Sequence, residues 1–270
     1  MEPLLQHEPI GFNRQHMKIR LAESSDEVRV AQRLRYHVFH GEGGAKFNGE
    51  AGLDADRFDA RSEHLLVIEP FNDVPAEFAL SDGKLIGTYR MLTQKSAAAL
   101  GGFYSASEFD LAPLLLRKNN LNFLELGRSC VLKRARGTAV VELLWQGIWN
   151  FVRANQVDVM LGCASFEGTD PLVYAQALSF LAQQIPVPEG WQVRALDRCH
   201  HNMNLVPPQS YDAKRVLAGL PPLIKGYLRL GCCFGEGCVI DRDFNTVDVL
   251  VILPVSAINP RYFARFGAPA

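Results

Sequence analysis

Residues 122–139 constrain the fold of this chain more than any other stretch, because they join a strand to a helix through a basic turn. The apolar residues of 123–132 predict the strand, and Glu125 and Arg128 interrupt them. The turn contains a glycine, and a helix is expected to begin at about Thr138. Free backbone N–H groups and the positive end of the helix dipole would then point at one spot, which predicts a phosphate site.

Composition narrows the class of protein. The chain has 270 residues, a net charge of -1, 48% hydrophobic residues and 21% charged residues. These values predict a soluble globular protein and argue against bulk binding of nucleic acid. Residues 1–16 lack the basic and then apolar order of a secretory signal, and no run approaches the ~18 apolar residues of a membrane span. We therefore expect a cytoplasmic protein.

Hydrophobic periodicity predicts a loose N-terminal arm over residues 1–16 and one domain over 17–270, with an insertion near 198–231. Strands are expected over residues 17–22, 64–71, 84–93, 123–132, 157–166, 191–196 and 246–253. Helices are expected from Ser24 or Ser25, over 138–154, from Asp170 and over 222–231. This order indicates an α/β fold, in which helices flank a mixed central sheet.

The cysteines do not predict a metal site. Neither the cluster at 199–201 nor the cysteines of 232–238 show paired C-x-x-C spacing. Cys130 and Cys163 lie in apolar runs, where a reduced and packed thiol is the ordinary state. We expect no metal, and the free thiols favour a reducing compartment.

The turn Arg134-Ala-Arg-Gly-Thr-Ala139 resembles the R/Q-x-x-G-x-G/A signature of the GNAT acyltransferase fold. In that fold the loop binds the phosphate of the acyl carrier's pantetheine arm. The resemblance implies that the phosphopantetheine of the donor is held by Arg134, Arg136, Gly137, Thr138 and Ala139. An ordinary basic turn that caps a helix is the alternative interpretation.

A longer pattern resembles the acyl-homoserine-lactone synthases, which are GNAT-like and use acyl-acyl carrier protein. Their signature is an R-x-x-x-F, two acids three positions apart, an arginine in the third strand and an E-x-x-R in the fourth. The matching residues are Arg35, Phe39, Asp56, Asp59, Arg90, Glu125 and Arg128. The tryptophan that those synthases carry after the first helix is absent from residues 40–55, which argues against S-adenosylmethionine as the acceptor.

Three stretches resemble the ornithine-lipid-forming N-acyltransferases, and this likeness covers residues 17–253. They lie at 125–131, 162–171 and 221–231. The likeness implies transfer of a (3-hydroxy)acyl chain from acyl carrier protein to the α-amine of ornithine, giving lyso-ornithine lipid without a cofactor. Alternatives are an N-acyl amino acid synthase using a related amine, an acyl-homoserine-lactone synthase, or a non-catalytic GNAT domain that binds an acyl carrier.

Amide formation from a thioester rests on positioning and on loss of a proton from the amine. Glu125 is the candidate base, and a β-bulge would bring it to the same side as its catalytic partner Arg128. The alternative is a structural ion-pair network of Glu125 with the arginines. For the acceptor site, the likeness implies Arg35, Phe39, Asp56, Asp59 and Arg90.

Asp56 and Asp59 are the candidate partners for the cationic end of ornithine, and a solvated acidic loop is the alternative. Tyr174 is a candidate donor of a proton to the leaving thiolate, although structural packing is the favoured interpretation. Because the product is an amphiphile, we also expect peripheral contact with the inner face of the membrane. The apolar stretches 103–116 and 221–231 are the candidate surfaces, and core packing or carrier docking are the alternatives for both.

Overall fold

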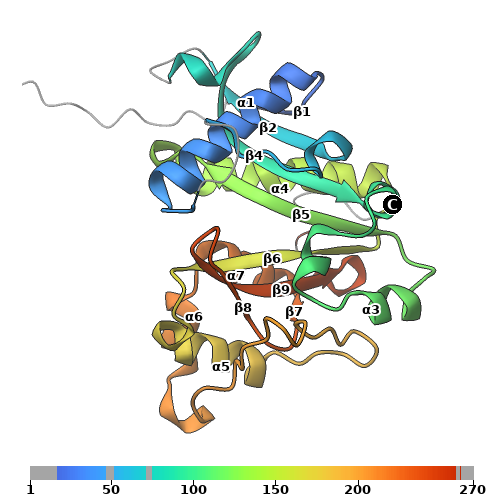
Figure 1. The fold of residues 1–270 in the computed structure, drawn as a ribbon, viewed down its shortest axis with the longest axis vertical. Coiled ribbons are helices and arrows are strands. Elements are labelled where there is room, and N and C mark those ends of the chain that lie inside the picture. The colour runs from blue at the N-terminus through green and yellow to red at the C-terminus, as the bar shows by residue number, and fades with distance from the viewer. Residues whose placement is uncertain (1–16, 47–51, 71–74, 260–261, 263–270) are drawn as a thin grey trace, which may run out of the picture.

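A nine-stranded mixed sheet runs through the protein, with the order β1-β2-β4-β5-β6-β9-β7, while β3 pairs with β4 and β8 pairs with β9 (Figure 1). The computed structural model describes residues 17–46, 52–70, 75–259 and 262, so the predicted arm over 1–16 lies outside the described residues. The strands are β1 (Lys18–Leu21), β2 (Glu63–Glu69), β3 (Ala79–Leu80), β4 (Gly83–Thr93), β5 (Phe123–Val131), β6 (Val159–Glu167), β7 (Cys233–Phe234), β8 (Val239–Asp241) and β9 (Thr246–Pro254).

Helices flank the sheet, which confirms the predicted fold class. They are α1 (Ser25–Tyr36), α2 (Gln94–Ala99), α3 (Ala112–Arg117), α4 (Thr138–Ala154), α5 (Ala175–Gln184), α6 (Ala213–Gly219) and α7 (Pro222–Leu230). Shorter turns are the π-helical η2 (His37–Glu42) and the 3-10 turns η3 (Asp59–Arg61), η4 (Ala76–Phe78), η5 (Tyr104–Ser107), η6 (Lys133–Ala135), η7 (Pro171–Tyr174), η8 (Pro208–Ser210) and η9 (Val255–Ala257). None of the helices in the described ranges has the length and hydropathy of a membrane span.

The two faces of the sheet are covered by different elements. Helix α1 lies in front of the sheet and α4 behind it in the view of Figure 1. Gly147 lets α4 approach closely, because a Cβ there would lie within 2.8 Å of the side chains of Ile19 and Leu65. On the face of α1, a second apolar cluster that includes Phe109, Leu114 and Phe123 underlies the segment from α2 to α3.

The sheet opens between β5 and β6. These parallel strands share three residue pairs, the last being Glu125 with Leu161, and beyond it they separate. Next to the last pair, Gly162 still lies close to β5, since a Cβ there would lie 2.1 Å from the carbonyl oxygen of Leu126. We call the separation of β5 and β6 beyond this last pair the splay.

A β-bulge lies on β5 at the splay. Thr88 pairs with Cys130 while Arg90 pairs with Gly127, so Arg128 and Ser129 together face one residue of β4. Arg128 has a positive φ of 52°, which residues other than glycine rarely adopt. This backbone conformation turns its side chain out of the regular alternation of the strand. From the sequence, a bulge between Glu125 and Arg128 was one way to bring both side chains to one side, and the register of β4 and β5 places a bulge at Arg128 and Ser129.

Most predicted elements are confirmed, including the cap of α1 by Ser24, whose side chain accepts a hydrogen bond from the N–H of Glu27. The strand expected over 191–196 is wrong. This segment forms isolated bridges, Phe109 with Ala195 and Arg194 with Glu236. The outer edge of β9 is already occupied by β7 and β8, so the segment has no place in the sheet. The division into one domain with an insertion near 198–231 stays a prediction.

Candidate active site

Two of the predicted arginines meet the predicted acids in the interior, on the face of the sheet that α1 covers. Arg35 forms a bidentate pair with Asp59, in which both N–O distances are 2.8 Å. Arg90 donates to Asp56 at 2.7 Å and to Asp59 at 3.0 Å. Burial acts to raise the pKa of Asp59, but the hydrogen bonds and charge of Arg35 outweigh it, so this pKa lies well below its usual value.

Arg128 completes this network with Asp54, an acid that the sequence analysis did not assign to the site. Its Nε lies 3.2 Å from Asp54, and a second guanidinium nitrogen lies 3.2 Å from Asp56. Asp54 also lies 2.8 Å from Nε of Arg35. Three arginines and three aspartates therefore balance in charge. We call these six residues the Arg–Asp network: Arg35, Asp54, Asp56, Asp59, Arg90 and Arg128.

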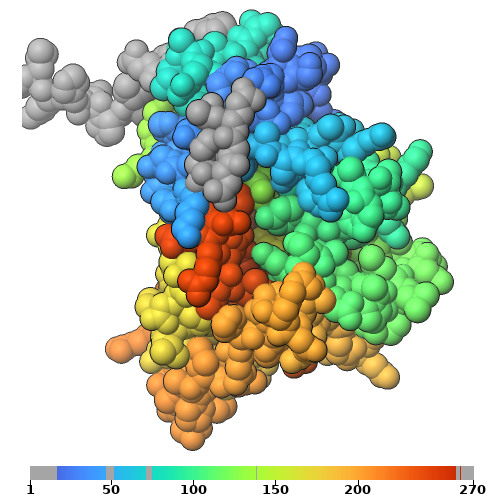
Figure 2. Space-filling model, viewed as in Figure 1, coloured from blue at the N-terminus to red at the C-terminus, as the bar shows by residue number. Residues whose placement is uncertain are grey.

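Aromatic rings enclose the end of Arg128. Its guanidinium carbon lies 4.7 Å from the ring centre of Tyr104 and 4.3 Å from that of Phe244. Phe39 packs edge-on against Phe244, with 5.7 Å between ring centres, so it reaches the network through that ring. Figure 2 shows the red segment that contains Phe244 between the blue segment of η2 and the green segment that follows β4.

Glu125 faces the same side as the Arg–Asp network but binds a different partner. Its carboxylate accepts hydrogen bonds from the N–H groups of Tyr104 and Ser105, at 2.7 and 2.8 Å, and from the Ser105 hydroxyl at 2.5 Å. Burial raises the pKa of Glu125 above its usual value, and the hydrogen bonds from Ser105 oppose that shift. Of the two alternatives weighed for Glu125, these contacts favour a structural role, although its partners are a turn rather than the arginines.

The predicted phosphate turn has the expected local structure. Gly137 is the N-cap of α4, with extended backbone and no capping side chain, and Thr138 and Ala139 begin the helix. The first N–H groups of α4 therefore receive no hydrogen bond from the side chain of their N-cap residue. Arg134 and Arg136 are partly exposed beside this end and form ion pairs with Glu69 and Glu42.

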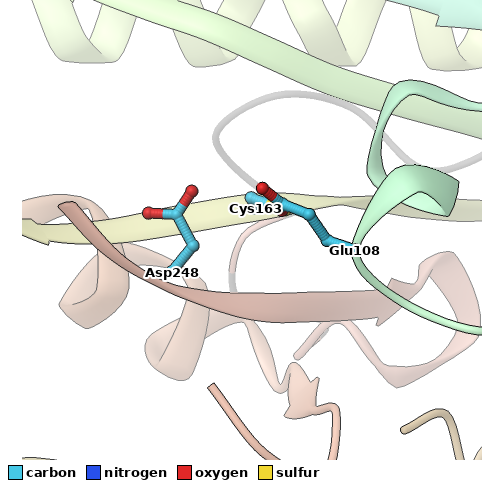
Figure 3. A group of neighbouring side chains, drawn as sticks. All are labelled: Glu108, Cys163 and Asp248. Atoms are coloured by element: carbon cyan, nitrogen blue, oxygen red, sulfur yellow. The ribbon is translucent and has the colours of Figure 1, made fainter. Parts of the chain in front are cut away.

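A second group of polar residues lies across the splay, and the sequence analysis missed it. Glu108, Cys163 and Asp248 have ligand atoms within 4.8 Å of one another (Figure 3). Burial is the main cause that raises the pKa of Glu108 to about 7 and that of Asp248 to about 6. One signal was present in the sequence, since Asp248 is a lone carboxylate inside an otherwise apolar strand.

Tyr174 has a structural environment. Its hydroxyl donates to the carbonyl of Glu167 at 2.6 Å, and its ring packs on Phe166 with 4.8 Å between centres. These contacts agree with the favoured interpretation that this tyrosine packs rather than donates a proton.

A mixed sheet that opens between two parallel strands, with the N-terminus of a helix after the first of them, defines an acyltransferase of the GNAT fold. Residues 34–146 match the family model described as an acetyltransferase (GNAT) domain. The solved structure of FeeM, an N-acyl amino acid synthase from uncultured soil microbes, has the same fold, with a TM-score of 0.50 and 10% identity over 92% of this chain and 97% of that one.

Curated relatives are much closer in sequence. The chain is 45% identical over 257 residues to the L-ornithine N(alpha)-acyltransferase of Agrobacterium fabrum, which covers 94% of this chain and 86% of that protein. It is 38% identical over 251 residues to the protein of that name from Rhodobacter capsulatus, with 91% and 92% covered. The chain therefore belongs to the L-ornithine N(alpha)-acyltransferase family, and the prediction of an acyltransferase is confirmed.

Proposed function

We propose that the protein transfers a (3-hydroxy)acyl chain from acyl carrier protein to the α-amine of ornithine, giving lyso-ornithine lipid. The observation that carries this proposal is the 45% identity over 94% of the chain to a protein named L-ornithine N(alpha)-acyltransferase. That similarity spans the turn before α4, both sides of the splay and the acidic loop. It therefore covers every element that we assign to donor and acceptor.

The donor's phosphate is assigned to the end of α4. An N-terminus without a capping side chain offers N–H donors and the positive end of the helix dipole to an anion. Arg134 and Arg136 stand beside it, and their guanidinium groups suit a phosphate. The thioester would then reach the splay, where β5 and β6 no longer pair.

In the reaction, the amine nitrogen forms a bond to the thioester carbon and the carbon–sulfur bond breaks. The amine loses a proton, and the leaving thiolate gains one. No covalent intermediate with the enzyme is needed, so catalysis rests on holding both substrates and on proton transfer. We assign Arg128 to the reacting end of the site, because it lies in the bulge of β5 beyond the last β5–β6 pair.

Glu125 is proposed to act through η5. Because both of its oxygens accept hydrogen bonds from that turn, it sets the position of Tyr104 beside Arg128. Its role as the base that takes the proton of the amine stays a prediction. Among the residues assigned to the acceptor, we propose that Arg35, Asp59 and Arg90 support the acceptor site as members of the Arg–Asp network. Phe39 supports the acceptor site through its ring contact with Phe244. Asp56 is partly exposed, with 24% of its side chain accessible.

The product is an amphiphile, so we also propose cytoplasmic synthesis with peripheral contact to the inner face of the membrane. Leu116 on α3 supports this, because 75% of it is exposed within the apolar stretch 103–116. The other candidate stretch is less suited, since Ile224 and Tyr227 of α7 are buried. Flotation with anionic lipid vesicles tests the contact, and Leu116→Ser should weaken it.

Purified protein incubated with 3-hydroxyacyl-acyl carrier protein and a panel of amines tests the transfer, with mass detection of the product. We expect acylated ornithine and release of the free carrier thiol. Matched reactions with 3-hydroxyacyl-coenzyme A identify the donor. Acylation of other amines but not of ornithine would overturn the acceptor. The absence of any product, together with retained carrier binding, would favour a non-catalytic carrier-binding domain.

A further inference from the structure

Glu108, Cys163 and Asp248 come from three separate parts of the chain and face one another beside the splay (Figure 3). Glu108 follows η5, Cys163 lies on β6 two residues beyond the last residue that pairs with β5, and Asp248 lies on the neighbouring strand β9. The Cys163 thiol donates a hydrogen bond to Glu108 at 3.3 Å. The group is therefore next to the place where the acyl chain must meet its acceptor.

The two carboxylates are not compensated by a basic partner. Asp248 is 6% exposed, and its Oδ1 atom is buried without a hydrogen-bond partner. Hydrogen bonds from the side chains of Ser165 and Thr246 act to lower the pKa of the Asp248 carboxyl group, but burial outweighs them. Within the described ranges, no ion pair joins either Glu108 or Asp248 to a lysine, arginine or histidine. Arg128 is a nearby cation, but its hydrogen bonds go to the aspartates of the Arg–Asp network. A buried carboxylate without a cationic partner is costly, and a bound cation lowers that cost.

The chemistry of the group favours an ammonium ion over a metal ion. Burial raises the pKa of the Cys163 thiol well above its usual value, so the sulfur carries its proton and serves as a hydrogen-bond donor. An ammonium group has three N–H donors and suits two carboxylates that approach from different sides.

The Arg–Asp network is less suited to binding an ammonium ion. Its three positive and three negative charges already balance, and Asp59 accepts hydrogen bonds from both Arg35 and Arg90. The sequence had suggested Asp56 and Asp59 as partners for the cationic end of the acceptor. The structure offers Glu108 and Asp248 as acids without such partners.

Resting on the proposed function, we propose that Glu108 and Asp248 bind the side-chain ammonium of a dibasic amino acid acceptor and thereby determine its selection. The α-amine cannot be this cation, because it must be neutral when it attacks the thioester. The side-chain ammonium keeps its charge throughout the reaction. It would hold the acceptor from the far side of the splay while the α-amine points toward β5.

Acylation of ornithine is compared with acylation of 2-aminopentanoate, which has the same carbon skeleton without the side-chain amine. We expect wild-type kcat/KM to favour ornithine by at least about 100-fold, as for a site built to pair with a missing group. Glu108→Gln and Asp248→Asn should each reduce that preference at least about tenfold, through a higher KM for ornithine. Asp110→Asn is the matched control, because this exposed acid lies on the same segment and outside the group.

Equal losses for both amines in the two variants would overturn the proposal, and so would a wild-type protein that does not discriminate between the amines. If one of the two variants fails to fold, the other still tests the assignment. Calorimetric binding of ornithine needs no donor, so a protein that binds ornithine through Glu108 yet acylates nothing would support this proposal while refuting the proposed function. Stabilisation by zinc or calcium that requires Glu108, without any effect of ornithine, would instead assign a metal site and overturn the proposal.

Discussion

Glu125 and Ser105 are joined twice, since one carboxylate oxygen of the strand residue accepts both the backbone N–H and the hydroxyl of the turn residue. The other oxygen accepts the N–H of Tyr104. Glu125 thus caps the turn η5, and the ring of Tyr104 lies against the guanidinium of Arg128 as a result. The position of Arg128 depends on a carboxylate three residues earlier in the same strand.

Glu125→Gln should lower the free energy of unfolding by about 1–3 kcal/mol, because the amide nitrogen of glutamine would face backbone N–H donors. Ser105→Ala should cost less, about 0.5–1.5 kcal/mol. Both variants should lower kcat, and both should keep the pH profile of the wild-type reaction. Urea unfolding and pH–rate profiles measure these effects. If Glu125→Gln removed the acid limb of the profile while Ser105→Ala left kcat unchanged, Glu125 would be the base.

Asp59→Asn should destabilise the protein by about 3–5 kcal/mol, because it leaves Arg35 buried without its main counter-charge. Asp197→Asn is the control, since this aspartate pairs with Arg194 at the surface with 90% of its side chain exposed. The control should change stability by no more than about 0.5 kcal/mol. Denaturant unfolding of the two variants checks the contrast, and similar values for both would contradict the buried character of the network.

Gly162→Ala should destabilise the sheet by at least about 1–3 kcal/mol, because the new Cβ would lie 2.1 Å from the carbonyl oxygen of Leu126 and neither backbone can yield easily. Gly127→Ala provides the matched comparison across the splay, since a Cβ there meets nothing within 4 Å. Thermal unfolding of the pair tests the point. A Gly162→Ala variant as stable as Gly127→Ala would show that the close approach of β5 and β6 is absent in solution.

Gly137→Asp should affect stability and donor binding in opposite directions. An N-cap aspartate would bond the free N–H groups of α4 and stabilise the protein by a few tenths of a kcal/mol. The same carboxylate would compete with a phosphate and raise the KM for the acyl carrier about tenfold or more. The KM for the amine should stay unchanged. Arg153→Ala, at the other end of α4, is a control that should leave both substrates unaffected.

Stability should fall between about pH 4 and pH 7 through Glu108 and Asp248. Burial raises their pKa values to about 7 and about 6, so the folded protein holds protons that the unfolded chain releases at lower pH. Their favourable contribution is complete below the unfolded pKa values and is lost as the pH rises through the folded ones. The difference in melting temperature between wild type and the Glu108→Gln, Asp248→Asn double variant should therefore change across this range. A pH-independent difference would contradict the shifted pKa values.

Much of the fold could be predicted because local periodicity carries it. The expected helix over 138–154 matches α4, and the expected strand over 84–93 falls within β4. Residues 191–196 show where such reasoning fails, since alternation alone cannot tell that the edge of β9 is already occupied.

The residues of the site likewise fall into those that the sequence could predict and those that it could not. The spacing of the arginines and aspartates carried a family resemblance, and the structure brings those residues together. Asp54 escaped notice because nothing in an acidic loop marks which acid turns inward. Glu108 and Asp248 are close in space but 140 positions apart in the sequence, because β9 lies beside the segment that follows η5. No local sequence pattern predicts such a contact.

The three residue pairs between β5 and β6 have a mechanical consequence, because β6 and β9 share nine. The sheet behaves as two leaves joined by a short seam. Behind it, the hydroxyls of Tyr89 and Tyr227 are bonded at 2.9 Å and tie the leaves at the back. One leaf carries the N-terminus of α4 and Arg128, and the other carries Cys163 and Asp248. Two substrates bound across the splay would contact both leaves and restrict their relative motion. Part of the binding free energy would then offset the entropy lost by this restriction.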